Sequence, residues 1–265
     1  MAEFNAKAPS IARVYDYLLG GKDNFAVDRE LAEKLISIYP PLAEMMSANR
    51  KFVARAVTWA ANQGIDQFID LGAGLPTAPN THETAQAVIP SARVVYVDND
   101  PVALTHLNAL LAKRGSGVAV LDGDAWQPKA IMSHPMVTRH VDLARPVCAI
   151  MAMLLHFIDA PTARALVRDY SAALAPGSFL VITIGRGENE VGDRTLSTYN
   201  SQGPAGLRNH SPAEFAEFFT GLDIVPPGLG QAQEHRPGWP EMPRSPQRGG
   251  QVLVGIGRIP ADRDH

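Results

Sequence analysis

Apolar positions in the first 65 residues recur with the spacing of α-helices. A first helix is predicted where they follow an i, i+3, i+4, i+7, i+8 stripe, at Ile11, Val14, Tyr15, Leu18 and Leu19. Ser10 stands where a helix N-cap belongs, and Gly20 stands where a helix ends. Two further helices are expected at about 28–38 and 42–62, on either side of Pro40-Pro41. We therefore expect residues 1–65 to form an N-terminal helical extension or lid.

The pattern changes after Gly64, where short continuous apolar runs begin to alternate with helical stretches. Strands are predicted at 67–71, 93–97, 118–121, 146–153 and 178–184. The helices between them are predicted near 83–89, 101–114, 128–133 and 161–174. Continuous apolar strands separated by helices are typical of a parallel sheet that is covered on both faces. We expect residues 66–265 to form this α/β domain, in one compact unit with the extension.

The end of the chain has a different order of elements. Ser211 and Glu214 form a capping box with Pro212 at the first helical position, which predicts a helix over 212–222. Strands are predicted at 222–225 and 251–259, and the segment between them is rich in proline and glycine rather than helical. Two strands without a crossover helix should pair antiparallel.

Composition and charge make a nucleic-acid-binding, membrane-spanning or secreted protein less expected. The 265 residues carry 24 basic and 27 acidic side chains, a net charge of −3, and no basic block of the kind that nucleic-acid binders show. No apolar run approaches the roughly 20 residues that span a bilayer, and we find no secretory signal pattern. We expect a cytoplasmic protein without a nucleic-acid or membrane partner; the sequence does not predict its oligomeric state.

Cysteine and histidine positions indicate neither a disulfide nor a metal site. The single cysteine, Cys148, lies in an apolar run and is expected to be a small buried hydrophobic residue. No cluster of His, Cys and acidic residues has metal-ligand spacing, so we expect no metal. His82 and His106 fall on predicted helices and are expected at the surface.

The stretch YDYLLGGKDNF, residues 15–25, contains Gly-Gly-Lys and invites comparison with a phosphate-binding loop. A Walker loop requires G-x-x-x-x-G-K-[ST] after a strand. Here Asp16 replaces the first glycine, Asp23 follows Lys22 in place of a hydroxyl residue, and a helix precedes the glycines. We therefore reject a nucleotide loop at this position.

Three acidic residues lie at the ends of three consecutive predicted strands. Asp70, Gly72 and Gly74 form D-x-G-x-G after the first strand, Asp98 ends the second, and Asp124 follows the third. Ligands of open α/β sheets bind at this edge, where a carboxylate can accept from ribose hydroxyls. Together the three predict a pocket for a nucleoside with a cationic tail. The alternative for each acid is a loop cap, a helix N-cap or a turn residue.

Several motifs resemble one family. These are ARVYDYLLGGKDNFAVDRELAE, NRKFVARAV, IDQFIDLGAGLPT, VVYVDNDP, LLHFID and LAPGSFLVIT. They look like an actinobacterial S-adenosyl methyltransferase family, first catalogued as a domain of unknown function, within the class I S-adenosylmethionine (SAM)-dependent methyltransferases. The resemblance covers about residues 8–258. It implies a Rossmann-like, seven-stranded sheet with an antiparallel last strand.

The resemblance also implies SAM as the cofactor and assigns residues to its parts. The methionine end would contact Asp70, Gly72, Ala73 and Gly74. The ribose would contact Asp98, with Asn99 beside it, and the adenine amine would contact Asp124, with Ala125 beside it. The chain departs from many methyltransferases by having Pro76 in place of a third glycine, and by a longer loop before the next helix.

Candidates for catalysis and substrate binding lie outside these motifs. His156, just after the fourth strand, is the candidate general base, the alternative being a histidine that packs at the strand end. Tyr199 and His210, in the segment between Gly187 and Ser211, are candidates for the wall of the acceptor pocket.

The double glycine at 20–21 is expected to bend the chain so that Lys22–Phe25 cover the pocket mouth. Tyr17 and Asn24 would then contact cofactor or acceptor. The alternative is a helix–turn–helix brace with a glycine C-cap.

The leading function is a SAM-dependent methyltransferase acting on a small molecule. One alternative is a non-catalytic SAM-binding regulator. Another is a nicotinamide-dependent oxidoreductase, which Asp70 and Thr77 disfavour because they do not fit a G-x-G-x-x-G pyrophosphate loop.

Overall fold

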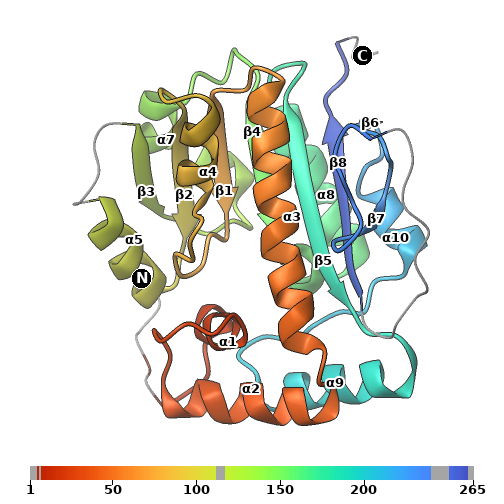
Figure 1. Ribbon diagram of the computed structural model, residues 1–265. Coiled ribbons are helices and arrows are strands. Elements are labelled where there is room, and N and C mark those ends of the chain that lie inside the picture. Colours follow the sequence, from red (N-terminus) through yellow and green to blue (C-terminus); the bar gives the residue numbers. More distant parts are fainter. Residues whose placement is uncertain (1–4, 6, 112–116, 240–250, 262–265) are drawn as a thin grey trace.

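The extension at the start of the chain consists of three helices. The computed structural model describes residue 5 and residues 7–111, 117–239 and 251–261. The helices are α1 (Ile11–Leu18), α2 (Ala26–Ile38) and α3 (Leu42–Asn62). Figure 1 shows α1 and α2 beneath one edge of the sheet, with α3 rising from them along one face. The three predicted helices are thus present.

Five parallel strands form the greater part of the sheet. They are β1 (Gln67–Leu71), β2 (Arg93–Asp98), β3 (Val118–Asp122), β4 (Cys148–Ala152) and β5 (Phe179–Arg186). Their order in the sheet is β3-β2-β1-β4-β5, and each neighbouring pair is parallel. The strand order reverses between β1 and β4, so a crevice opens there at the carboxyl ends of both strands.

The last long strand closes the sheet in the opposite direction. β8 (Gln251–Arg258) pairs antiparallel with β5 over eight residues, as predicted. Two short strands, β6 (Asp223–Ile224) and β7 (Gly230–Gln231), pair antiparallel with β8. The described sheet therefore has eight strands rather than the expected seven. The additional strand, β7, has only two residues, too few to leave an apolar pattern.

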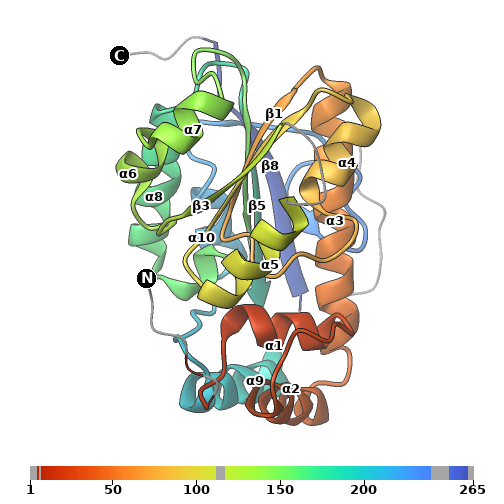
Figure 2. The ribbon, with the colours of Figure 1, turned by 90° about the vertical axis from the view of Figure 1, so that its left-hand side faces the viewer.

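Helices cover both faces of the sheet (Figure 2). On one face lie α3, α4 (Thr81–Val88) and α5 (Pro101–Leu111), and on the other lie α6 (Pro128–Met132), α7 (Pro135–His140), α8 (Ala160–Ala172) and α10 (Pro212–Glu217). Alternate residues of each strand enter the two cores. Phe68 of β1 packs in the core of the α3 face, and Ile69 packs in the core of the α8 face. Cys148 is fully buried in β4, as expected.

Two helices of the structure were not predicted: the short α7, which follows the helix expected at 128–133, and a helix in the segment before Ser211. Residues 187–211, expected as a linker, contain α9 (Asn189–Gln202), which lies beside α2 (Figure 1). Its sequence is largely polar, and only Gly192 and Tyr199 are buried. A 3-10 turn, η1 (Leu155–Phe157), follows β4 and places His156 in the interior.

The turn between α1 and α2 is organised by the carboxylate of Asp16. This carboxylate accepts hydrogen bonds from the backbone N–H of Asp23, at 2.9 Å, and from Nδ2 of Asn24, at 2.8 Å. Gly21 packs so closely that a Cβ atom there would lie 2.0 Å from Asp16 Oδ1. The double glycine therefore belongs to a tight structural turn.

Within the described ranges, no helix combines the length and the apolar character that crossing a bilayer requires.

Candidate active site

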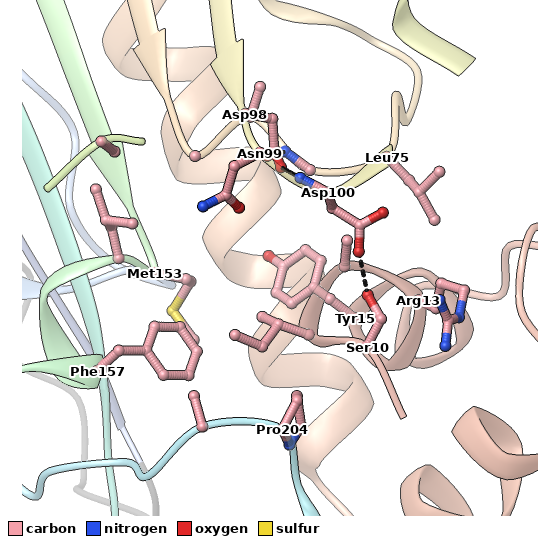
Figure 3. A pocket seen from close by; sticks show the side chains of 18 of the residues that line it. Ser10, Arg13, Tyr15, Leu75, Asp98, Asn99, Asp100, Met153, Phe157 and Pro204 are labelled. Atoms are coloured by element: carbon pink, nitrogen blue, oxygen red, sulfur yellow. Dashed lines mark hydrogen bonds between the residues drawn. The ribbon is translucent and has the colours of Figure 1, made fainter. Parts of the chain in front are cut away.

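A cavity of about 470 Å³ opens at the carboxyl ends of β1, β2, β3 and β4. We call it the sheet-edge cavity; Figure 3 shows part of its lining. All eight residues predicted to bind the cofactor line it: Asp70, Gly72, Ala73, Gly74, Asp98, Asn99, Asp124 and Ala125. Residues from three separate strand ends therefore meet in one site, as the sequence predicted.

The glycine loop after β1 wraps back onto the end of β2. Gly72 and Gly74 have φ angles of +69° and +65°, which side chains other than glycine rarely adopt. The Gly74 N–H donates to Asp98 Oδ2 at 2.7 Å, and the Asp100 N–H donates to Asp98 Oδ1 at 2.8 Å. A Cβ on Gly72 would lie 3.0 Å from Leu154 Cδ1. The loop thus holds the Asp98 carboxylate in place and packs at Gly72 against Leu154.

Two carboxylates of this cavity are buried. Asp70 is 6% exposed and accepts a hydrogen bond from the Thr81 hydroxyl at 2.6 Å. Burial raises the pKa of Asp70, while the Thr81 hydrogen bond and the Arg50 guanidinium act in the opposite direction. Burial also raises the pKa of Asp98. The cavity therefore favours a ligand that brings positive charge or hydrogen-bond donors to these oxygens.

The third acid, Asp124, lines the same cavity from the loop after β3. Asp124 Oδ1 accepts from the Trp126 N–H at 3.0 Å, which turns the chain after β3. The carbonyl of Ala125 accepts from the Tyr170 hydroxyl at 2.9 Å. This arrangement fixes the loop and leaves the second oxygen of Asp124 as a suitable acceptor for an exocyclic amine.

The N-terminal extension contributes cavity residues that were not predicted to belong to the site. The Ser10 hydroxyl donates to Asp100 Oδ2 at 2.6 Å, which ties the start of α1 to the end of β2 (Figure 3). Asn49 and Arg50 of α3 also line the cavity. Oδ1 of Asn49 is buried and has no hydrogen-bond partner among the described residues. The available signal was the motif NRKFVARAV, which apolar periodicity treated only as core helix.

The expected lid residues lie elsewhere. Tyr17 does not line the cavity, and its hydroxyl donates to Glu33 of α2. Asn24 is held by Asp16 and by the carbonyl of Gly21. Residues 8–13 and Tyr15, rather than Lys22–Phe25, contribute to the cavity lining. The turn after α1 folds back onto its own helix because the Asp16 carboxylate binds it, so the brace interpretation fits better than the lid.

His156 has a geometry that does not suit a general base. Its Nδ1 accepts the Gly185 backbone N–H at 3.0 Å, so the neutral ring carries its proton on Nε2. Burial, with a smaller contribution from the nearby His210, lowers the pKa of His156 to about 3. The nitrogen that could accept a proton, Nδ1, is thus already occupied by the Gly185 N–H. The contacts of His156 fit the alternative stated above, a histidine that packs at the end of the strand.

Tyr199 and His210 lie near His156 but outside the sheet-edge cavity. His210 is buried, and its Nε2 donates to the carbonyl of Leu155 at 3.2 Å. Tyr199 lines a second, smaller cavity together with His156. The structure therefore places Tyr199 on the wall of this second cavity. His210 instead stabilises η1 through its hydrogen bond to Leu155.

The two histidines expected at the surface, His82 and His106, differ in how deeply they are buried. His82 is only 1% exposed, and its Nδ1 lies 2.8 Å from the Tyr96 hydroxyl. The surface prediction was wrong there, because the first turn of α4 packs against β2. His106 is partly exposed and lies 3.4 Å from Asp23. In the part of the chain that the structure describes, no three His, Cys, Asp or Glu side chains gather as metal ligands would.

The residues of the sheet-edge cavity fit SAM. The unpartnered Asn49 Oδ1 and the buried Asp70 carboxylate suit an ammonium group or a sulfonium. The glycines of the β1 loop let its backbone approach a ligand closely. Asp98 and Asp124 offer acceptors for ribose hydroxyls and for an adenine amine. The donor set of such a cofactor matches the acceptors that the chain provides.

The fold and the site together define a class I SAM-dependent methyltransferase. Parallel strands closed by an antiparallel β8, with acids at the ends of β1 and β2 and just after β3, are the features of this class that the resemblance implied. A family model described as S-adenosyl methyltransferase matches residues 1–260. The chain belongs to this family, SAM is its cofactor, and the protein is a SAM-dependent methyltransferase.

Solved structures agree with this assignment. A candidate methyltransferase from Thermobifida fusca shares 39% identity over 96% of both chains, with a TM-score of 0.86. A DUF574 family protein from Streptomyces avermitilis shares 33% identity over 96% of this chain and 99% of its own, with a TM-score of 0.85. Magnesium protoporphyrin IX methyltransferase from Synechocystis, solved with bound S-adenosylhomocysteine, shares the fold at 11% identity, with a TM-score of 0.53 over 93% and 92% of the chains. No curated protein matches the sequence.

Proposed function

We propose that this methyltransferase acts on a small molecule and that its residues work by positioning rather than by proton transfer. The observation that carries the proposal is the arrangement of the cavities. The sheet-edge cavity is lined by the acids of three strand ends, and a second cavity shares its wall at Met153 and Phe157. That second cavity, at about 140 Å³, has room for a small group only.

When bound, SAM would supply a methyl group from its sulfonium. The acceptor's lone pair would bond to the methyl carbon, and the electrons of the broken carbon–sulfur bond would stay on sulfur. The chain's part is to hold donor and acceptor in line and to exclude water. Asp70 and Asn49 would hold the methionine end, Asp98 the ribose, and Asp124 the adenine. Because Nδ1 of His156 is occupied, we assign no proton transfer to it; an acceptor proton would be lost to bulk water when the methylated product leaves the site.

Location in the cytoplasm is part of the same proposal. It is supported by the single buried Cys148, which cannot form a disulfide within the chain. Cell fractionation with an antibody to the protein tests it.

The role of Asp98 provides the first prediction. Asp98→Ala should lose the charge-assisted hydrogen bonds to the ribose, about 2–4 kcal/mol or roughly 30- to 1000-fold in Kd. Asp98→Asn keeps one acceptor oxygen and should lose less. Isothermal titration calorimetry with SAM measures both.

Asp122→Asn is the matched control, because Asp122 pairs in register with Asp98 on β3 but is exposed and does not line the cavity. Equal affinity of wild type and Asp98→Ala would refute the ribose assignment. The small-molecule class is tested separately: with radiolabelled SAM and a cell extract divided by size, label should enter the low-molecular-mass fraction, and labelling of the macromolecular fraction alone would refute that class.

A further inference from the structure

A second cavity, which we call the helical cavity, lies between the N-terminal extension and the end of β4. Its volume is about 140 Å³. The elements that line it are α1, α2, α3, η1, α9 and the end of β5. It is thus enclosed largely by helices that stand outside the parallel sheet, beneath its edge (Figure 1).

The helical cavity adjoins the sheet-edge cavity. Four residues line both: Ile11, Tyr15, Met153 and Phe157. Figure 3 shows Met153 and Phe157 together on one side and Tyr15 facing them, below Asp98 and Asn99. Met153 has a φ angle of +54°, an unusual backbone conformation for a residue other than glycine, and such outliers cluster at functional sites. A ligand in the helical cavity would therefore lie next to the cofactor site.

The lining of the helical cavity is apolar. Three methionines, Met45, Met46 and Met153, contribute flexible side chains that adapt to a ligand's shape. The lining guanidinium, Arg186, already forms an ion pair with Glu188. A charged ligand group would lose its hydration there without gaining an unpaired partner of opposite charge in the described lining, which is costly. The cavity accordingly selects a neutral group.

Two side chains give this apolar site a polar end. The hydroxyl of Tyr199 is buried and has no hydrogen-bond partner among the described residues, although Tyr199 is only 7% exposed. A buried hydroxyl without a partner carries a desolvation cost that a ligand can relieve. His156 presents Nε2–H, because its Nδ1 already accepts from Gly185. Both groups can donate to an oxygen atom.

We propose that the helical cavity binds the methyl acceptor, and that the part of the acceptor it holds is a neutral six-membered ring bearing an oxygen, as in a phenol. The inference rests on the proposed function. An apolar cavity of roughly 150 Å³ accommodates benzene, so one ring matches the volume of this one. The oxygen attached to the ring would accept a hydrogen bond from the Tyr199 hydroxyl. The methyl-accepting atom would lie at the wall shared with the sheet-edge cavity.

The test uses phenol and toluene as probes on the protein saturated with S-adenosylhomocysteine. Ligand-observed NMR titration measures the Kd of each probe. Tyr199→Phe should raise the Kd of phenol about five- to tenfold, the loss of one hydrogen bond, and leave that of toluene within about twofold. Leu196→Trp, which fills the cavity from α9, should abolish binding of both probes. Benzoate should not compete, since its charge would be buried.

The outcomes separate this inference from the proposed function. The S-adenosylhomocysteine affinity of Tyr199→Phe and Leu196→Trp should match that of wild type, because neither residue lines the sheet-edge cavity. If wild type binds S-adenosylhomocysteine but not phenol, or if Tyr199→Phe binds both probes as wild type does, the acceptor inference is wrong. If wild type binds no S-adenosylhomocysteine, the assignment of the sheet-edge cavity fails instead.

Discussion

Asp70 and Asp98 are buried carboxylates at the ends of neighbouring strands, and burial raises the pKa of both. A carboxylate in such a place weakens the fold when it is ionised, because it has lost its hydration. The same desolvation strengthens its attraction for a cationic ligand, since screening by water is weak. The site therefore gives up stability in the free protein to gain affinity for a sulfonium cofactor.

Replacing the charge at position 70 should reverse this balance. Asp70→Asn should stabilise the free protein by about 1 kcal/mol at pH 7 and weaken SAM binding roughly ten- to a hundredfold. The folded protein holds a proton on Asp70 over a range above the ordinary pKa of 3.8, so ionisation lowers stability as pH rises through that range. The gain in stability should thus shrink as the pH falls toward 3.8, which denaturant unfolding at several pH values measures.

Cofactor affinity should respond to pH in the opposite sense. In the wild type it should decrease on acidification as Asp70 takes up a proton, and in Asp70→Asn this dependence should be reduced. Asp66→Asn is the control, since Asp66 pairs with Arg145 outside the sheet-edge cavity. Identical pH profiles of affinity for wild type and Asp70→Asn would contradict the assignment of Asp70 to a cationic group.

The tautomer of His156 can be observed without knowing the acceptor. Because Nδ1 accepts from Gly185 and the pKa lies near 3, the ring should stay neutral with its proton on Nε2 from pH 8 to pH 5. Nitrogen-15 NMR of the imidazole ring measures this, and His156→Asn identifies the signal. The Asn Oδ1 can accept the same N–H, so the variant should fold and bind cofactor normally. A His156 signal that titrates between pH 6 and 7 would restore the general-base interpretation.

At the scale of elements, the turn between α1 and α2 determines how α1 lies over the cavity. Asp16 binds the backbone of Asp23 and the side chain of Asn24, while Ser10 at the other end of α1 binds Asp100. The helix is thus fixed at both ends by side-chain hydrogen bonds. The stretch YDYLLGGKDNF therefore works as a clamp for the part of α1 that lines the sheet-edge cavity.

The two glycines of this turn should differ in their tolerance of a side chain. Gly21→Ala places Cβ against the Asp16 carboxylate and should cost about 2–4 kcal/mol through lost hydrogen bonds and strain. Gly20→Ala meets no atom within 4 Å and should cost only about 1–2 kcal/mol, for its φ of +79°. Denaturant unfolding measures both.

A double-mutant cycle isolates the cause. In an Asp16→Ala background the carboxylate is gone, so Gly21→Ala should cost clearly less than in the wild type. Equal costs in the two backgrounds would show that the clamp does not explain the double glycine.

The elements that the sequence predicted are those with a strong apolar pattern. Strands β1 to β5 read as continuous apolar runs because both of their faces are buried, and β8 shares this pattern. The helix α9 has a largely polar sequence in which only Gly192 and Tyr199 are buried, so its apolar positions show no helical periodicity. The three acids were predicted because residues at parallel strand ends meet at one edge. Ser10, Asn49 and Arg50 were not, because their place depends on how the extension packs against that edge.

At the scale of the whole molecule, the extension and the sheet share one core. Residues of α1, α2 and α3 belong to the same buried cluster as residues of β1, β2, β4, β5 and β8. Residue 65 therefore marks a change in the sequence pattern and not a boundary between two separate cores. We propose that both parts unfold together. A cofactor that bridges Asn49 of the extension and Asp98 of the sheet would reinforce this coupling.

The single cysteine supplies a natural reporter of that cooperativity. Cys148 is fully buried between β1 and β5, and burial raises the pKa of its thiol. A thiol reagent such as Ellman's reagent should therefore label the chain only when the central strands separate, at one equivalent per chain. The labelling rate should follow the global free energy of unfolding and fall about a hundredfold at SAM concentrations a hundred times Kd. Rapid labelling under native conditions would instead reveal local opening at β4, the strand beside the proposed site of methyl transfer.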